Sequence, residues 1–291
     1  MASNAITPLP DGYEIKQLTI EHLVWVQAII GHTMSFDSPL WADAPYGEGL
    51  TREDGQTQRA YDMYAAIAPS AEECIGSGLS YGLFKKEWKP QFEDTHPGGQ
   101  LRWDTGDCSA TMEQLLKQMD FPLVSIAMTK ARREGPKPPP PVGIKKTWPE
   151  IVPLFATISG SFKKQEQNNY LAFAHLPAHE KIAQRSGTHT RSDYQGQQLM
   201  KALAHHVMKK VAAKGYHKIV IQSTSDNVTK VWENPPLGYT ATVTGEFDTG
   251  EYREKDKDGN EYNPFGTAEV VCKKIWVDLR PEERGQGSGG K

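Results

Sequence analysis

The residues best suited to chemistry in this sequence lie between Thr188 and Tyr239. A glycine turn at residues 194–198 separates an extended segment from an amphipathic helix. The first N–H groups of a helix have no partner within the helix, and they lie at the positive end of its dipole. The turn therefore predicts a site for a phosphate or pyrophosphate group. The alternative is an ordinary strand-to-helix turn without a ligand.

His189 lies just before this turn, and an imidazole with a near-neutral pKa suits a general base. Side chains alternate along a strand, so His189 and its neighbours Thr188 and Thr190 point to opposite faces. Other candidates for the base are His175, His179 and Glu180, whose spacing predicts no metal site. His205 and His206 fall inside the helix, where a surface or packing role is expected.

Composition limits the class of protein. The chain has 291 residues, 37% hydrophobic and 24% charged, with a net charge of −3. These values are typical of a globular protein and argue against a nucleic-acid or anionic-membrane binder. The first residues show no secretory signal, and no apolar run approaches the ~18 residues of a membrane span. Three scattered cysteines predict a reducing compartment and, with the other features, a cytoplasmic location.

The first half predicts a strand over 13–18, a helix over 20–30 that stops at Gly31, and a nearly continuous apolar central strand over 121–129. Between them we expect a helix near 52–67, a strand over 79–85 and a short helix over 112–119. A capping box at 147–150 predicts a helix within 151–164, limited in length by Pro153 and Gly160. Pro138–Pro141 predict a rigid surface segment or, alternatively, a ligand for a partner domain.

Four tryptophan and tyrosine residues of this half stand in irregular segments and could line a pocket or fix long loops to the core. They are Trp41, Tyr46, Trp88 and Trp103.

The second half is more regular. It predicts a strand over 182–190, the glycine turn, a helix from Leu199 that stops at Gly215, and a buried strand over 218–222. Asp226 or Ser225 caps a second helix that ends at Pro235-Pro236. Trp232 in this helix is expected in core or interface packing, with an active-site role as the alternative. Two alternating strands follow, over 240–247 and 269–279, joined by a long charged hairpin connection.

This order resembles the GNAT family of acyl-coenzyme A-dependent N-acyltransferases. Residues 194–199 look like the family's pyrophosphate-binding turn, Gln/Arg-x-x-Gly-x-Gly/Ala followed by a helix. Asn227, followed by Leu237-Gly238-Tyr239, looks like the family's next segment. The resemblance is strongest over 180–245 and loose over 13–30.

The resemblance implies a single α+β (three-layer α/β) domain over 1–279, with a mixed, mostly antiparallel twisted sheet flanked by helices. Residues 13–30 would be its first strand and helix, 31–170 a large acceptor-side insertion, and 180–245 the coenzyme A-binding core. Residues 280–291 would form a mobile tail.

The implied reaction is acyl transfer, with acetyl-CoA or another acyl-CoA as donor and a small-molecule amine as acceptor. The thioester carbonyl would meet a backbone N–H near Thr190, and catalysis would involve His189 and Asn234. The remaining implied coenzyme A contacts are Gln195, Gly196, Gln197, Gln198, Leu199, Met200, Asn227 and Lys230.

Three residues depart from the family pattern: Asp193 replaces Gln/Arg, Gln198 replaces Gly/Ala, and Asn234 stands where a proton-donating tyrosine is common. An asparagine amide donates a hydrogen bond but supplies no proton. These departures motivate a second hypothesis, a GNAT-fold binding or interaction module whose chemistry is lost or altered. A third is a lyase or hydrolase acting on an apolar metabolite.

Overall fold

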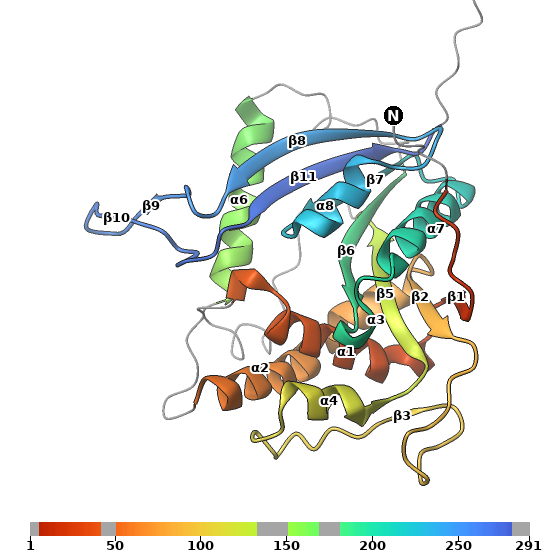
Figure 1. The fold of residues 1–291 in the computed structure, drawn as a ribbon. Coiled ribbons are helices and arrows are strands. Elements are labelled where there is room, and N and C mark those ends of the chain that lie inside the picture. Colours follow the sequence, from red (N-terminus) through yellow and green to blue (C-terminus); the bar gives the residue numbers. More distant parts are fainter. Residues whose placement is uncertain (1–5, 42–50, 133–150, 169–180, 281–291) are drawn as a thin grey trace, which may run out of the picture.

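A computed structural model describes residues 6–41, 51–132, 151–168 and 181–280 (Figure 1). The elements of the first half are β1 (Tyr13–Gln17), η1 (Ile20–His22), α1 (Leu23–Phe36), η2 (Pro39–Trp41), α2 (Arg52–Ala66), α3 (Ala68–Gly76), β2 (Tyr81–Lys85), β3 (Gln100–Leu101), α4 (Met112–Gln118), β4 (Met119–Asp120), β5 (Leu123–Ala131) and α6 (Ile151–Asn168). Those of the second half are β6 (Ile182–Thr190), η3 (Ser192–Tyr194), α7 (Leu199–Ala213), β7 (Lys218–Ser223), α8 (Asp226–Glu233), β8 (Thr240–Asp248), β9 (Glu254–Lys255), β10 (Glu261–Tyr262) and β11 (Val271–Asp278).

The main sheet of the described residues has seven strands in the order β1-β2-β5-β6-β7-β11-β8. The pairing of β6 with β7 is parallel, and the other pairings in this sheet are antiparallel. Helices cover both faces, with α7 and α8 on one side of the twisted sheet (Figure 1). The predicted mixed, mostly antiparallel sheet between helical layers is confirmed.

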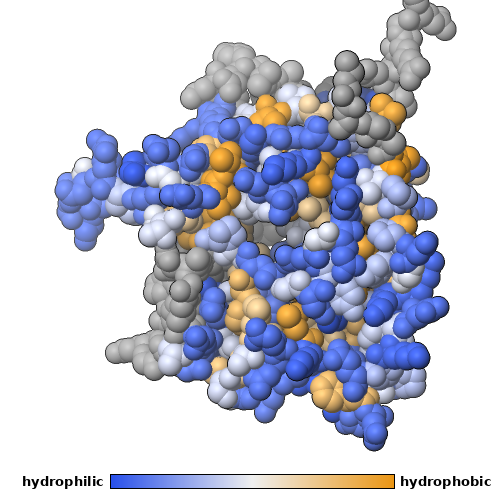
Figure 2. Space-filling model, viewed as in Figure 1, coloured by the Kyte–Doolittle hydropathy of each residue, from blue (hydrophilic) through white to orange (hydrophobic). Residues whose placement is uncertain are grey.

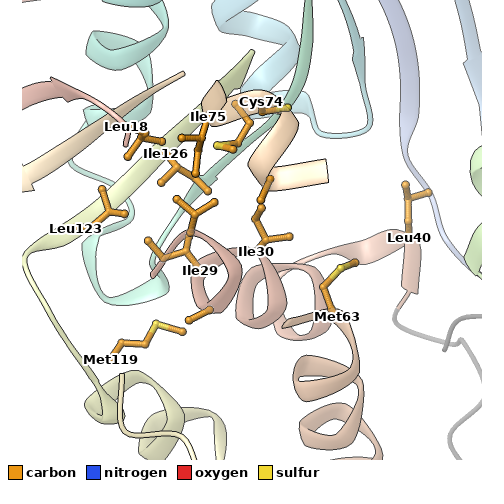
Figure 3. Packing of buried hydrophobic residues seen from close by; sticks show 14 of the residues in the cluster. Leu18, Ile29, Ile30, Leu40, Met63, Cys74, Ile75, Met119, Leu123 and Ile126 are labelled. Carbon is orange, nitrogen blue, oxygen red and sulfur yellow. The ribbon is translucent and has the colours of Figure 1, made fainter. Parts of the chain in front are cut away.

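Two hydrophobic cores lie on opposite faces of the sheet. One joins α1, α3 and α6 to β5, and Figure 3 shows Ile29 and Ile30 of α1 directed toward Ile126 and Cys74. The other joins the apolar stripe of α7 to β5, β6, β7 and β11, and it includes the fully buried Trp232 of α8. Burying each large apolar side chain contributes about 1.5–3 kcal/mol, so these layers hold β6 in place between them.

The first helix does not stop at Gly31, and this prediction was wrong. A Cβ on Gly31 would lie 2.6 Å from the carbonyl oxygen of Ala60 in α2. The glycine therefore allows α1 and α2 to approach closely, and α1 continues to Phe36. Its last turns carry Thr33 and Asp37 toward β6 and the glycine turn.

The helix predicted after 150 is also longer than expected. α6 runs for 18 residues through both Pro153 and Gly160. Pro153 lies in the first turn, where a missing N–H removes no helical hydrogen bond. Helix α3 was not predicted from the sequence. The other strands and helices predicted within the described residues are present within a few residues of their expected bounds.

Trp103 fixes a loop to the core. Its indole N–H donates to the carbonyl of Leu115 at 3.0 Å, and its ring packs against Tyr61 and Tyr64. The predictions for Tyr46, the Trp41 side chain, Pro138–Pro141 and the capping box at 147–150 lie outside the described residues.

Candidate functional site

The parallel strands β6 and β7 diverge soon after they meet. Their pairing covers Ile182 to Gln184 on β6 and Lys218 to Val220 on β7, whereas β6 continues to Thr190. Beyond Gln184, the edge of β6 that faces away from β5 has no strand partner among the described residues. The space-filling view shows a hollow between the half of the molecule that carries β8 and β11 and the half that carries β5 (Figure 2).

We call the diverging part of these two strands, which on β6 runs from Arg185 to Thr190, the β6–β7 fork. The glycine turn follows Thr190, at the open end of this fork. Gly196 has a φ of 79°, and a Cβ there would meet no atom within 4 Å. The turn therefore needs glycine for its backbone conformation, because L side chains are disfavoured at positive φ. Gln198, the N-cap of α7, also has a positive φ of 58° and is the single non-glycine residue with this feature in the described chain.

Backbone donors are available at the start of α7. The first backbone hydrogen bond of α7 runs from the N–H of Ala202 to the carbonyl of Gln198 at 3.2 Å. The N–H groups of Leu199 and Met200 bond to no backbone carbonyl of the described residues. Free N–H groups at a helix start can hold an anion, so this part of the predicted pyrophosphate site has the required donors.

Asp193 is neutralised locally. Arg191 donates to its carboxylate through Nε at 3.1 Å and through Nη2 at 2.7 Å. Arg191 is buried, and its Nη1 also donates to the carbonyl of Met119 at 2.9 Å. The negative charge expected to oppose a pyrophosphate therefore has a fixed cationic partner two residues away.

Asp37, at the end of α1, holds the turn from the opposite side. Its carboxylate accepts hydrogen bonds from Ser192 Oγ at 2.8 and 3.0 Å and from Gln195 Nε2 at 2.9 Å. Burial raises the pKa of Asp37, while the bonds from Ser192 and Gln195 oppose the rise. This contact was not predicted, since no local pattern relates residues 155 positions apart.

The N-terminal segment lies against the same turn. Tyr13 donates its hydroxyl hydrogen to Gln197 Oε1 at 2.9 Å, and the N–H of Thr7 donates to Nδ1 of the buried His205 at 3.2 Å. A cavity of about 370 Å³ lies between the segment and the turn. Its lining residues are Thr7, Pro8, Leu9, Pro10, Gly196, Gln197 and Gln198.

His189 projects toward α1, where its ring contacts Thr33. Thr33 Oγ1 lies 2.8 Å from His189 Nδ1 and also donates to the carbonyl of Ile29 at 2.8 Å. The hydroxyl has one hydrogen for these two acceptors; with that hydrogen on Ile29, Nδ1 is the donor and Nε2 carries the lone pair. Burial, with a smaller contribution from the Arg185 charge, lowers the pKa of His189 to about 3.

Gly187 leaves room for the imidazole ring of His189. A Cβ on Gly187 would lie 2.7 Å from His189 Nε2, closer than any normal contact. The imidazole therefore lies over a position of β6 that has no side chain.

The backbone N–H of Thr190 points away from β5, toward the side where β6 has no strand partner in the described residues. The N–H of Arg191 donates to the carbonyl of Val124 on β5. Successive N–H groups of a strand point in opposite directions, so the N–H of Thr190 points away from β5. Its hydroxyl lies 2.7 Å from Ser125 Oγ, which fixes the side chain on β5.

The predicted residues of α8 are exposed, apart from Trp232. Asn227 and Lys230 lie on the surface of the helix, and α8 contacts α7. Asn234 ends α8 and donates its side-chain amide to the carbonyl of Lys230 at 2.8 Å. Its predicted catalytic role is not tested by this placement.

The other candidate residues predicted from the sequence lie away from the β6–β7 fork or outside the described residues. His206 packs against Tyr81. His175, His179 and Glu180 lie outside the described residues. Within the described ranges, no three His, Cys, Asp or Glu side chains are grouped as a metal site, and no helix is long and apolar enough to span a membrane.

Comparison with known proteins identifies the fold. No protein-family model and no curated protein matches this sequence. Solved structures do match: the C-terminal condensation domain of Ebony in complex with beta-alanyl-dopamine has a TM-score of 0.56 and 16% identity, over 91% of this chain and 97% of that chain. Arylalkylamine N-acetyltransferase 2 from Aedes aegypti has a TM-score of 0.57 and 12% identity, over 93% and 100%. A mosquito arylalkylamine N-acetyltransferase-like protein, 5b, has a TM-score of 0.51 and 14% identity, over 91% and 99%.

Many of the matching structures are GNAT-family N-acetyltransferases, and the chain has the GNAT fold. At these identities the similarity concerns the fold alone. The fold class that the sequence predicted is confirmed.

Proposed function

We propose that this chain is an acyl-CoA-dependent N-acyltransferase that acts on the amine of a small molecule, with acetyl-CoA as its donor and the cytoplasm as its location. The observation that carries the proposal is the fork between β6 and β7, which opens at Gly196 and at the free N–H groups that begin α7. The edge of β6 without a strand partner in the described residues would bond the amide groups of a pantetheine arm. The free N–H groups at the start of α7 would hold the pyrophosphate. Solved GNAT-fold N-acetyltransferases support the same reaction class.

The acyl donor supplies an activated carbonyl. The chain would bind its pyrophosphate at the backbone from Gln195 to Met200, with Asn227 and Lys230 of α8 contacting the rest of the donor. The Thr190 N–H, directed into the fork, would donate a hydrogen bond to the thioester oxygen as negative charge develops there.

His189 Nε2 is the proposed acceptor of the proton that the amine loses when the new N–C bond forms. The Thr33 contact orients the ring, and the pKa of about 3 keeps the imidazole neutral at physiological pH. This pKa also makes His189 a weaker base than the near-neutral imidazole expected from the sequence. Asn234 donates to Lys230 and can supply a hydrogen bond but no proton to a departing thiolate.

Calorimetry of the purified protein with acetyl-CoA tests the proposal. We expect saturable binding, and we expect replacement of Gly196 by leucine to abolish it. Gly160→Leu is the matched control, because Gly160 also has open space around its Cβ but lies in α6 without a positive φ. Absence of acetyl-CoA and CoA binding to the wild type at high concentration would exclude this function.

A second candidate is a binding module without turnover. It is favoured by the side-chain amide of Asn234, which is engaged in ending α8 where many relatives of this fold class carry a proton donor. Turnover of acetyl-CoA with a panel of amines would remove this alternative, while binding without turnover would support it.

A further inference from the structure

Arg185 is a buried cation that has no acidic partner among the residues that the structure describes. The residue is 4% exposed, and its Nη1 donates to the carbonyl of Met128 at 2.7 Å. Its Nε and Nη2 atoms are buried and have no hydrogen-bond partner in the described part of the chain. Within the described ranges it forms no ion pair, and burial lowers its pKa to about 9. A buried guanidinium with two unused donors is unfavourable, so the position calls for an anion that the described residues do not supply.

The position of Arg185 connects it with the fork. β6 pairs with β7 only as far as Gln184, so Arg185 is the first residue of β6 after the strands diverge. It pairs with Thr129 of β5, two residues from Ala127, and Ala127 belongs to the core under α7 and α8. Arg185 therefore lies at the closed end of the fork, on the face that α8 covers.

Two more buried groups of the same region have no partner within the described ranges. The guanidinium of Arg185 lies 5.8 Å from the ring centre of Trp232 in α8, and the indole Nε1 of Trp232 is buried without a partner. Thr188 pairs with Ala127 and shares its face, and its hydroxyl is also buried without a partner. A guanidinium, an indole N–H and a hydroxyl are all able to donate to an oxyanion.

We propose that Arg185, assisted by Trp232 and Thr188, binds a carboxylate group of the substrate at the closed end of the β6–β7 fork. The inference rests on the proposed acyltransferase function and adds a substrate class to it. The carboxylate belongs either to the acyl chain of the donor, as in a succinyl group, or to an amino-acid acceptor. The planar guanidinium matches the two oxygens of a carboxylate.

Paired substrates that differ in one carboxylate separate these sources. Succinyl-CoA is compared with acetyl-CoA for the donor, and tryptophan with tryptamine for the acceptor, by kcat/KM in the wild type and in Arg185→Gln. We expect the variant to lose at least 10-fold on the carboxylated member of one pair and to change little on the other member. The affected pair identifies the source. Equal losses on both members of both pairs would overturn the proposal.

Arg132→Gln is the matched control, because the guanidinium of Arg132 also packs over a tryptophan, Trp276, at 5.2 Å but is exposed on the surface. We expect it to leave both ratios unchanged. If Arg185→Gln does not fold, Arg185→Lys keeps the charge but not the paired geometry, and we expect the same loss of selectivity at reduced size.

Thermal unfolding provides a test that needs no coenzyme A. Ligands that bind the folded state raise its melting temperature. We expect sodium succinate to raise the melting temperature of the wild type above that in sodium chloride of equal ionic strength, and to have no such effect on Arg185→Gln. An equal response in both proteins would overturn the carboxylate site. Failure of acetyl-CoA to bind the wild type, with the succinate effect intact, would instead contradict the acyltransferase function.

Discussion

Thr33 of α1 and His189 of β6 are joined by a contact of 2.8 Å between Oγ1 and Nδ1. The two residues come from elements 156 positions apart in the chain. The contact orients the imidazole, and the tautomer with its proton on Nδ1 leaves Nε2 as the basic atom.

Replacing Thr33 by valine tests whether this arrangement matters for the reaction. Valine has a similar shape but no hydroxyl to bond His189 Nδ1, so the orientation of the imidazole would no longer be fixed. General-base catalysis contributes about 10²–10⁴-fold, and we expect kcat to fall by about 10-fold or more with little change in KM. Thr33→Ser keeps the hydroxyl and should retain most of the activity. Equal kcat values for the valine and serine variants would exclude the positioning role.

The lowered pKa of His189 predicts how stability depends on pH. In the unfolded chain an imidazole binds a proton near pH 6.5, whereas His189 in the folded chain does so only near 3. The unfolded state therefore binds more protons between these values, and stability falls as the pH drops from about 6.5 toward 3. His32 and His205, whose pKa values burial lowers to about 4, add to the same trend.

Urea unfolding at pH 7, 5 and 4 measures this effect. We expect His189→Gln to lose less stability between pH 7 and pH 4 than the wild type, whatever its stability at pH 7. Parallel losses in the two proteins would show that His189 titrates normally. The kcat/KM profile of the wild type should have no inflection from His189 near pH 6.5.

Local sequence signals account for the parts of the fold that were predicted correctly. The apolar stripe of α7, the positive-φ glycine at 196 and the strands β6 and β7 are each specified by neighbouring residues. Gly31 was misread because its role is set by Ala60 of another helix, and a glycine that permits close packing looks like one that stops a helix.

The candidate site also contains some residues that the local sequence indicates and others that only the tertiary structure brings together. The glycine turn was found from its own residues, whereas Asp37 was not, because its partners Ser192 and Gln195 are distant in the chain. The unpaired state of Arg185 is a property of the tertiary structure, and Arg185 and Trp232 meet only when α8 folds over β6. A sequence cannot indicate which charge will be buried without a counterion.

Gly187 provides a test of the packing of His189. A Cβ there would lie 2.7 Å from Nε2, so Gly187→Ala must displace the imidazole or the strand. We expect a loss of about 1–3 kcal/mol in the free energy of unfolding, as for other overpacked sites. In a His189→Ala background the same change should cost at least about 1 kcal/mol less, since neighbouring residues couple by about 0.5–3 kcal/mol. Additive losses in the double-mutant cycle would contradict the contact.

Gln198 offers the last test, because its backbone conformation is unfavourable for its residue type. Its φ of 58° would cost a glycine nothing, whereas a left-handed conformation costs other residues about 1–2 kcal/mol. Glycine also makes the unfolded chain more flexible, so we expect Gln198→Gly to raise the free energy of unfolding by about 0.5–1 kcal/mol. It should also tighten acetyl-CoA binding, because a small residue lets a pyrophosphate approach the start of α7. Gln197→Gly is the adjacent control. Gln197 has no positive φ and accepts a hydrogen bond from Tyr13, so its replacement should destabilise the protein. A destabilised Gln198→Gly variant would mean that the Gln198 side chain contributes more than its backbone conformation costs.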